Sequence, residues 1–316
     1  RGECGVANLN ARLQEALNPT SARRAERRLG GRLFRVGDKV MQSLNDYYRE
    51  VYNGDIGRVT GIDIVAQTLE VTFDGLPSGD STLTLALPVW RTGRYVVLDP
   101  AGGVVSFDAF DGSNKPLRWQ KTDKRTWAIE TSGTPTVVAR YTVFADEFAQ
   151  RTRGLNDERA FVDGTTVFMY SENYRWLPVT LTVQPYGSWH VTTGLDAVSG
   201  KPNTFTAPNY DHLADCPLEI GMQKDFVFTI DRKEHVLSIT GEGNYDSTKL
   251  IADISTIVKK QAEFWGGLPY ERYVFFLALS PRGSGGTEHI NSCVMGARPF
   301  IFKDPVAYAK FLGLVS

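Results

Sequence analysis

The sequence predicts a protein that is mainly β, with an α+β part at its C-terminal end. Short alternating runs of apolar and polar residues, separated by turn residues at intervals of roughly 8–12 residues, are typical of a β-sandwich. Near residue 243 the apolar period changes from that of strands to that of a helix. The length of 316 residues is enough for two or three domains.

Composition and charge narrow the class of protein. Hydrophobic residues make up 42% of the chain and charged residues 22%, as in ordinary globular proteins. The net charge of −1 provides no overall attraction to nucleic acid or membrane. No run of about 18 apolar residues occurs, so no membrane partner is expected. The chain begins with Arg1 and has no signal peptide, and the cytoplasm and the periplasm both stay open as its location.

A short helix and a small antiparallel barrel are the first expected elements. Asn18-Pro19 ends a helix whose apolar residues recur at helical spacing. These residues are Val6, Leu9, Leu13 and Leu17. Alternating runs follow at residues 34–42, 50–63 and 69–75, and Asn53-Gly54 in the second run is a strong turn signal.

The same region is locally basic. Between Arg12 and Lys39 the chain has eight Lys or Arg against three Asp or Glu, an excess of five positive charges. Clustered arginines neutralise phosphates, which makes four of them candidates for contacts with nucleic acid. These are Arg23, Arg24, Arg27 and Arg28. A solvated loop with one charged face explains the same composition.

Four segments carry a resemblance to a DNA-processing family. "GVANLNARLQEALNP", "FRVGDKVMQ", "YREVYNGDIGRVTGID" and "LEVTFDG" resemble, in order, the C-terminal part of RecD-type DNA helicases. That resemblance covers residues 1–75 and implies an SH3-like barrel in a DNA-binding accessory fragment. The chain has no G-x-x-x-x-G-K-[ST] phosphate loop, so we do not expect a motor.

The middle of the chain is expected to be a sandwich. Alternating apolar positions continue from residue 69, with turn residues between the runs. The expected strands lie within residues 69–97, 104–110, 126–131, 136–145, 165–170, 177–195, 224–231 and 234–241.

The last part is expected to combine helices with a buried strand. Residues 245–267 form a helix, capped by Asp246 or Ser247 and ended by Gly266-Gly267. Its apolar face comprises Leu250, Ile251, Ile254, Ile257, Val258 and Trp265. The continuous apolar run at 272–280 predicts a strand buried on both faces. A final helix starts at Asp304-Pro305 and is expected to run into the last residue without a C-cap.

The stretch "GSGGTEHINSC" combines a glycine-rich turn, an expected strand and one carboxylate. Gly283, Gly285 and Gly286 allow another backbone to approach closely, and the strand could pair with an extended peptide. Glu288 could then hold a cationic group such as a free α-amine. The alternative is an exposed glutamate beside an ordinary turn.

The same stretch carries a second resemblance. "GGTEHINS" resembles the G-G-x-E-H-x-N-S signature of the PDZ-containing glycyl aminopeptidases, a family of zinc metallopeptidases. "LTLALPVWRTGRY", "SWHVTTGL", "NYDHLADCPLEIG", "GNYD" and "YVFFLAL" resemble further segments of that family in order, although Thr92 stands where proline is usual. The resemblance runs from about residue 69 to residue 316.

This resemblance implies three parts. A helicase-like fragment (1–75) would be followed by an N-terminal β-sandwich domain (76–243) and the truncated start of a thermolysin-like catalytic domain (244–316). Glu288 would bind the free amine of a peptide substrate, and Gly285 and Gly286 would let its backbone pair along the strand. In a strand, His289 and Asn291 share one face, where they would line the cleft or be satisfied locally.

The family's chemistry requires zinc held by H-E-x-x-H on a helix. No histidine of this chain is followed by glutamate, and the resemblance places the zinc helix after Ser316. We therefore expect no catalytic residue and no metal ligand here, and a fragment that is inactive by itself. The complete enzyme would remove N-terminal residues, including glycine, from peptides with a free N-terminus.

Two incomplete families joined near "LEVTFDG", within residues 69–76, suggest a chimeric product of recombination or of sequence assembly. Besides the peptidase, two other classes of function stay open. One is nucleic-acid binding by residues 1–75, and the other is a β-sandwich that only mediates interactions.

Overall fold

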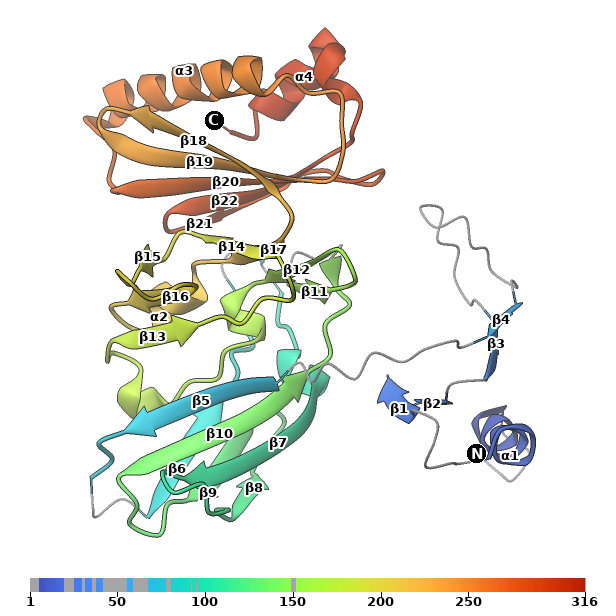
Figure 1. The fold of residues 1–316 in the computed structure, drawn as a ribbon. Helices are drawn as coiled ribbons and strands as arrows, with labels where there is room; N and C mark the ends of the chain where they lie inside the picture. The colour runs from blue at the N-terminus through green and yellow to red at the C-terminus, as the bar shows by residue number, and fades with distance from the viewer. Residues whose placement is uncertain are drawn as a thin grey trace. The chain divides into compact units, whose positions relative to one another are not determined.

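A computed structural model of the chain describes residues 6–19, 26–29, 32–35, 38–41, 56–58, 68–77, 81–91, 93–94, 96–148 and 152–315. The chain divides into two compact units, residues 1–68 and residues 69–316. Most of the regular structure is strand (Figure 1), so the prediction of a mainly β protein is confirmed.

The first unit contains a helix and two antiparallel strand pairs. Helix α1 (Val6–Leu17) ends immediately before Asn18-Pro19, as predicted. Strand β1 pairs with β2 and β3 with β4; their bounds are β1 (Glu26–Leu29), β2 (Arg32–Arg35), β3 (Lys39–Met41) and β4 (Ile56–Arg58). The predicted turn at Asn53-Gly54 lies outside the described residues.

Asp38 connects the helix to the strands of this unit. Its carboxylate accepts hydrogen bonds from Asn18 Nδ2 and from the backbone N–H of Arg35, both at 2.7 Å. Burial by itself would raise the pKa of Asp38, but these bonds and one from Gln14 lower it below its usual value.

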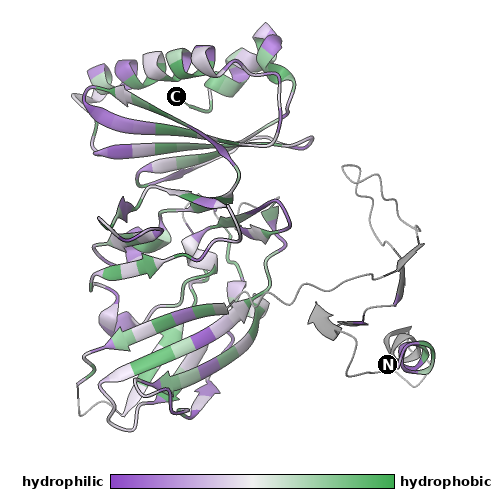
Figure 2. Cartoon of the chain, viewed as in Figure 1, coloured by the Kyte–Doolittle hydropathy of each residue, from purple (hydrophilic) through white to green (hydrophobic). Residues whose placement is uncertain are grey.

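The second unit begins with a sandwich of two three-stranded sheets. One sheet has the order β5-β10-β7 and the other β6-β9-β8. The strands are β5 (Thr68–Asp74), β6 (Thr82–Ala86), β7 (Val104–Asp111), β8 (Trp119–Lys121), β9 (Thr126–Glu130) and β10 (Thr136–Val143), and the 3-10 turn η1 (Pro100–Gly103) precedes β7. Every second residue of β10 is buried and shares a core with Leu83 and Leu85 of β6. Hydropathy alternates along these strands in Figure 2, as the sequence predicts.

A second pair of sheets follows. The orders are β11-β12-β17-β14 and β13-β16-β15. The strands are β11 (Arg153–Leu155), β12 (Arg159–Val162), β13 (Val179–Thr182), β14 (His190–Thr193), β15 (Asp196–Ala197), β16 (Thr204–Ala207) and β17 (Leu218–Gly221). Helix α2 (Tyr210–Ala214) and the 3-10 turns η3 (Gly164–Thr166) and η4 (Glu172–Tyr174) connect them.

One predicted strand of this region is wrong. Residues 165–170 were expected to be extended, but they begin inside η3. The side chain of Asp163 accepts a hydrogen bond from the backbone N–H of Thr165, which caps a turn where the apolar pattern favoured a strand.

The last sheet has five strands in the order β18-β19-β20-β22-β21. Their bounds are β18 (Lys224–Ile230), β19 (Lys233–Thr240), β20 (Arg272–Leu279), β21 (Gly286–His289) and β22 (Ser292–Ala297). The central pairs β19–β20 and β20–β22 are parallel. Phe275 packs in the core shared with α3 (Ser247–Trp265), whereas Phe276 packs against Phe161 of β12. The prediction that this run is buried on both faces is confirmed.

The sheet pairing differs from the predicted division at residue 243. Strands β18 and β19, expected in the sandwich, are hydrogen-bonded neighbours of β20 in the five-stranded sheet. Periodicity identifies a strand but not its partner, because the partner is set by the three-dimensional register. Residues 224–240 therefore group with the C-terminal part.

Helices α3 and α4 (Pro305–Leu312) cover one face of this sheet (Figure 1). Asp246 caps α3 by accepting a hydrogen bond from Lys249 N at 3.1 Å, and Gly266 ends it, as predicted. Leu250 and Ile254 are buried, but Trp265, expected on the same face, is 76% exposed.

The final helix ends earlier than predicted. Helix α4 follows the 3-10 turn η5 (Ile301–Lys303) and stops at Leu312, where Gly313 caps it and donates to Ala309 O at 3.2 Å. The apolar residues beyond Gly313 suggested a continued helix, but the chain turns there instead. Within the described ranges, no helix combines the length and apolarity that a bilayer crossing needs.

Candidate functional site

Strand β21 carries the "GTEH" segment and forms one edge of the five-stranded sheet (Figure 1). The hydrogen bond from Gly296 N to Gly285 O, 2.9 Å long, sets the phase of its antiparallel ladder with β22. Hydrogen-bonded pairs alternate in such a ladder. The odd positions from Gly285 onward therefore bond toward β22, whereas the backbone N–H and C=O of Gly286 and Glu288 point to the outer edge.

The side chain of Glu288 is exposed, while its neighbours Thr287 and His289 are buried on the opposite face. A β-carbon placed on Gly93 would lie 3.8 Å from Oε2 of Glu288, so the carboxylate lies beside the Gly93 backbone. No ion pair joins Glu288 to another described residue. A cationic ligand could therefore reach this carboxylate without displacing a partner.

The two glycines before Glu288 have different structural roles. Gly285 has a φ of 69°, in the left-handed region that favours glycine. At Gly286 a β-carbon would make only ordinary contacts, 3.8 Å from Met295 Cγ and 3.8 Å from Val294 O. The packing of the chain does not require a glycine at residue 286, which leaves space for the backbone of a ligand.

His289 faces the sandwich instead of the outer edge. Its side chain is 2% exposed, and its Nδ1 lies 3.0 Å from Asp215 Oδ1. The other carboxylate oxygen of Asp215 accepts the backbone N–H of Ile290 at 2.9 Å. Of the two roles predicted for His289, this geometry favours local satisfaction over lining a cleft. No sequence pattern indicated Asp215 as its partner.

Asn291 lies in a turn, so the prediction that it shares a strand face with His289 is wrong. The ladder closes between His289 and Ser292, which leaves Ile290 and Asn291 as a two-residue turn. Asn291 Nδ2 donates to Gly194 O at 2.8 Å, and its Oδ1 lies 3.4 Å from Cys216 Sγ. A β-carbon on Gly194 would overlap the amide of Asn291. Asn291 therefore fastens the turn to the sandwich.

The thiol of Cys216 completes this attachment. Its residue is fully buried, and burial raises its pKa to about 12, with a smaller contribution from the charges of Asp215 and Asp196. At neutral pH the thiol is therefore protonated and can donate to the amide oxygen of Asn291.

Arg91 and Asp163 form a buried ion pair, which is a further polar contact of this region. Arg91 Nη1 is 3.0 Å from Asp163 Oδ2, and each side chain is 2% exposed. Burial raises the pKa of Asp163, while a hydrogen bond from Thr165 and the charges of Arg91 and His289 oppose that rise. The positions of Arg91 and Asp163 are 72 residues apart, and no sequence pattern paired them.

The residues that the structure describes do not fit a zinc site. None of the four histidines is followed by glutamate in the sequence. In the part of the chain that the structure describes, no group of three or more His, Cys, Asp or Glu could hold a metal ion. His289, the histidine of the motif, lies against the carboxylate of Asp215.

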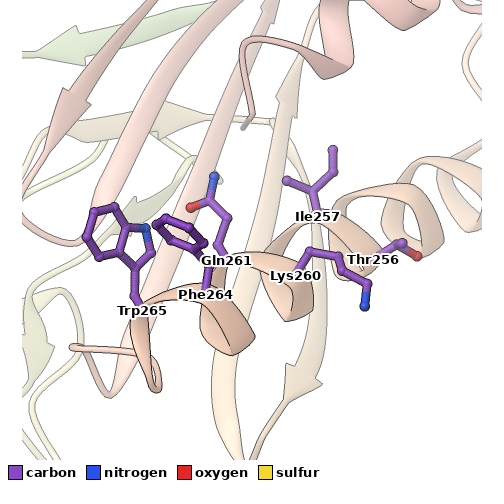
Figure 3. Close-up of a pocket in the computed structure, with 6 residues that line it drawn as sticks. All are labelled: Thr256, Ile257, Lys260, Gln261, Phe264 and Trp265. Carbon is purple, nitrogen blue, oxygen red and sulfur yellow. The ribbon is translucent and has the colours of Figure 1, made fainter.

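A cavity of about 610 Å³ reaches the hairpin turn and is bordered by Trp90, Asp215 and Ile290. Its wall also contains Arg175 and Asp211, which form an ion pair at 2.6 Å. A second hollow of about 380 Å³ lies on α3, where Figure 3 shows Phe264 and Trp265 together near the end of the helix. Its lining is largely apolar and has no acid–base pair to support chemistry.

The arginines predicted to contact nucleic acid are only partly placed. Arg27 and Arg28 lie on β1, of which the backbone alone is described, and Arg23 and Arg24 fall outside the described residues. Contact with nucleic acid stays a prediction from the charge pattern.

Two protein families match the chain. Residues 58–222 match the family described as the peptidase M61 N-terminal domain. Residues 9–73 match the family described as the SH3 domain of ATP-dependent RecD-like DNA helicases. The first match ends just before β18, and the two matches overlap at residues 58–73.

Several solved structures resemble the chain, among them the following three. An aminopeptidase N family protein from Idiomarina loihiensis has a TM-score of 0.68 and 27% identity, over 74% of this chain and 40% of its own. An M1 zinc metallopeptidase from Deinococcus radiodurans has a TM-score of 0.41 and 13% identity, over 78% and 58%. Yeast LTA4 hydrolase has a TM-score of 0.46 and 9% identity, over 79% and 40%. The chain thus spans two fifths of the Idiomarina protein.

Proposed function

Since this chain belongs to the family of the peptidase M61 N-terminal domain, we propose that residues 69–316 are the front part of a zinc metallo-aminopeptidase. The resemblance to the Idiomarina aminopeptidase N family protein supports a peptidase-like region at the level of fold and family. The substrate would be a peptide with a free N-terminus, and N-terminal glycine would be among the residues removed.

The observation that carries this proposal is the outer edge of β21. A peptide that adds as an antiparallel strand would exchange hydrogen bonds with the outward backbone groups of Gly286 and Glu288. It would run from Glu288 toward Gly285, with its first residue beside the carboxylate. The carboxylate would hold the ammonium group by a charge-assisted hydrogen bond. An N-acetylated peptide lacks that charge and loses this interaction.

Zinc would supply the polarisation of the peptide carbonyl and the activation of water in the complete enzyme. The sequence has no H-E-x-x-H, so we expect this chain to show only background aminopeptidase activity with added zinc. Clear turnover that a chelator abolishes would contradict the expectation. The proposal also includes a PDZ domain in the complete enzyme, as in the glycyl aminopeptidases.

Binding to the chain as it exists tests the amine site without catalysis. Triglycine amide and its N-acetylated form would be titrated into deuterated, ¹⁵N-labelled protein while the backbone amide signals are followed. We expect the free-amine peptide to shift the signals of Gly286 and Glu288 and the acetylated peptide to shift them much less. Glu288→Gln should remove this difference between the peptides.

Glu263→Gln is the matched control, because Glu263 is an exposed carboxylate on α3 paired with Lys260. It should bind both peptides as the wild type does. Equal binding of the two peptides by the wild type would refute the amine-binding role of Glu288.

The second candidate function is DNA binding by residues 1–75, favoured by the match to the RecD-like SH3 family. Binding of the whole chain to duplex DNA should then weaken steeply with salt, and replacing Arg23, Arg24, Arg27 and Arg28 by alanine should flatten that dependence. An unchanged salt dependence would refute these contacts.

The overlap of the two family matches supports a join near residues 69–76. Strand β5, which carries "LEVTFDG", lies in the sandwich sheet beside β10. We propose a chimeric product of recombination or of sequence assembly. Amplification across the join from source DNA tests the assembly origin, which a continuous genomic reading frame would exclude.

A further inference from the structure

A turn of the first sandwich stands against the edge strand. Arg94 N donates to Arg91 O at 3.3 Å, and between them Gly93 has a φ of 70°. Leu98 N donates to Val89 O at 2.8 Å, which closes the loop behind the turn. This Gly93 turn, comprising Arg91, Gly93 and Arg94, is part of the "LPVWRTGRY" segment.

The backbone of Gly93 packs directly on β21. A β-carbon placed on Gly93 would overlap Cγ2 of Thr287 and would lie 3.6 Å from its Cβ. The same position is 3.8 Å from Oε2 of Glu288. Thr287 is 4% exposed, so it has little freedom to move away. Glycine is therefore required at residue 93 for two reasons, the left-handed φ and the contact with Thr287.

Polar side chains hold both sides of this contact. The ion pair of Arg91 with Asp163 anchors the turn, and the hydrogen bonds of Asp215 to His289 and Ile290 anchor the strand. The spacing between the turn and the strand is thus set by a fully buried ion pair on the side of the turn and by the partly buried carboxylate of Asp215 on the side of the strand.

We infer that the Gly93 turn lines the amine site together with β21 and positions the Glu288 carboxylate at the outer edge of that strand. This inference rests on the proposed amine-binding role of Glu288. Gly93 and Thr287 are positioning residues, because the turn packs on Thr287 while its missing side chain leaves space beside Oε2 of Glu288. The β-sandwich thereby contributes to peptide binding itself as well as supporting the sheet.

Exchange of the two contacting side chains tests this inference. Gly93→Ala would add the methyl group that overlaps Thr287, and it should weaken binding of triglycine amide by about tenfold. Thr287→Ser removes Cγ2 and should change binding by less than about twofold. The double variant Gly93→Ala/Thr287→Ser has room for the added methyl and should recover the part of the affinity that the overlap removed, while the strain of the left-handed φ remains. N-acetyl triglycine amide, measured in parallel, should bind the wild type and the three variants with similar affinity.

The wild-type chain provides a test that does not depend on the folding of a variant. Triglycine amide should shift the amide signals of Gly93 and Arg94 together with those of Gly286 and Glu288. Unshifted signals of Gly93 and Arg94 in the bound protein would overturn the inference.

The two proposals fail in distinguishable ways. If Glu288→Gln loses the preference for the free amine while Gly93→Ala binds as the wild type does, the role of the Gly93 turn is refuted. The amine-binding role of Glu288 is then still supported. If the wild type does not distinguish the free from the acetylated peptide, the proposed function fails and this inference fails with it.

Discussion

The two faces of strand β21 differ in what their residues contact. Thr287 and His289 are buried and face the sandwich, where His289 bonds to Asp215. Gly286 and Glu288 alternate with them, are exposed, and direct their backbone groups to the outer edge. Four residues can thus hold a strand in place and still leave a binding edge, because anchoring and exposed residues alternate with the period of the strand.

The two edges of the five-stranded sheet differ in the same sense. At the β18 edge the exposed charges are paired, with Lys224 Nζ 2.9 Å from Glu242 Oε1 and Asp225 accepting a hydrogen bond from Thr192. At the β21 edge Glu288 pairs with no other described residue. Charged residues on an edge usually protect it from unwanted pairing. One carboxylate beside two glycines provides much less protection and leaves β21 open to a peptide.

Removal of the buried ion pair between Arg91 and Asp163 should have the largest effect on stability. Asp163→Ala removes the buried carboxylate that pairs with the guanidinium of Arg91, which should lower the free energy of unfolding by about 3–5 kcal/mol. Thermal unfolding followed by circular dichroism measures this loss. The variant Arg91→Met/Asp163→Ala should recover part of it, and a loss well below 1 kcal/mol for Asp163→Ala alone would contradict a structural role for the pair.

Loss of the strand anchor should cost somewhat less. Asp215→Ala removes the acceptor of both His289 and the Ile290 N–H, and we expect a destabilisation of about 2 kcal/mol. Hydrogen exchange at the Ile290 amide should become faster. Asp211→Ala is the control, because its ion pair with Arg175 is partly exposed and should contribute less than about 1 kcal/mol. Equal effects of the two variants would show that Asp215 is no special anchor.

Loss of a hydrogen bond in the turn of Ile290 and Asn291 should have the next largest effect on stability. Asn291→Ala removes the hydrogen bond to Gly194 and the acceptor for Cys216, with an expected loss of about 1 kcal/mol. The thiol of Cys216 should then react faster with iodoacetamide at pH 8, because opening of the turn exposes it. Peptide mapping by mass spectrometry measures the rate, and an unchanged rate would place the protection of Cys216 elsewhere.

A change on the exposed face should have the smallest effect on stability. Glu288→Gln alters an exposed side chain that pairs with no described residue, so we expect the free energy of unfolding to change by less than about 0.5 kcal/mol. Urea denaturation is a suitable measurement. A larger loss would mean that Glu288 supports the fold, and the contrast between the two faces of β21 would disappear.

The sequence predicted those local elements that depend on interactions between residues close together in the chain. Asp246 and Gly266 bound α3 as predicted, and the continuous apolar run became β20, buried on both faces. The glycine-rich turn and the expected strand made Glu288 a candidate, and the resemblance of "GGTEHINS" to an aminopeptidase signature distinguished it from an ordinary exposed glutamate. Its exposure agrees with the period of two, which places Thr287 and His289 on the other face.

The partners of these elements could not be predicted in the same way. Asn291 was expected on a strand face, but the ladder closes before it and makes it a turn residue that bonds to Gly194. Strands β18 and β19 were assigned to the sandwich, although their periodicity fits either sheet equally well. Trp265 has helical spacing with the buried residues of α3 and is nevertheless exposed.

Composition, periodicity and capping residues are local properties, and they were enough to predict a mainly β chain and its principal helices. The tertiary structure alone brought together Arg91 with Asp163, Asp215 with His289, and Gly93 with Thr287. The physical reason is that burial and close packing depend on which segments meet in space. A sequence pattern carries no information about a contact between residues that lie on separate strands and loops of the chain.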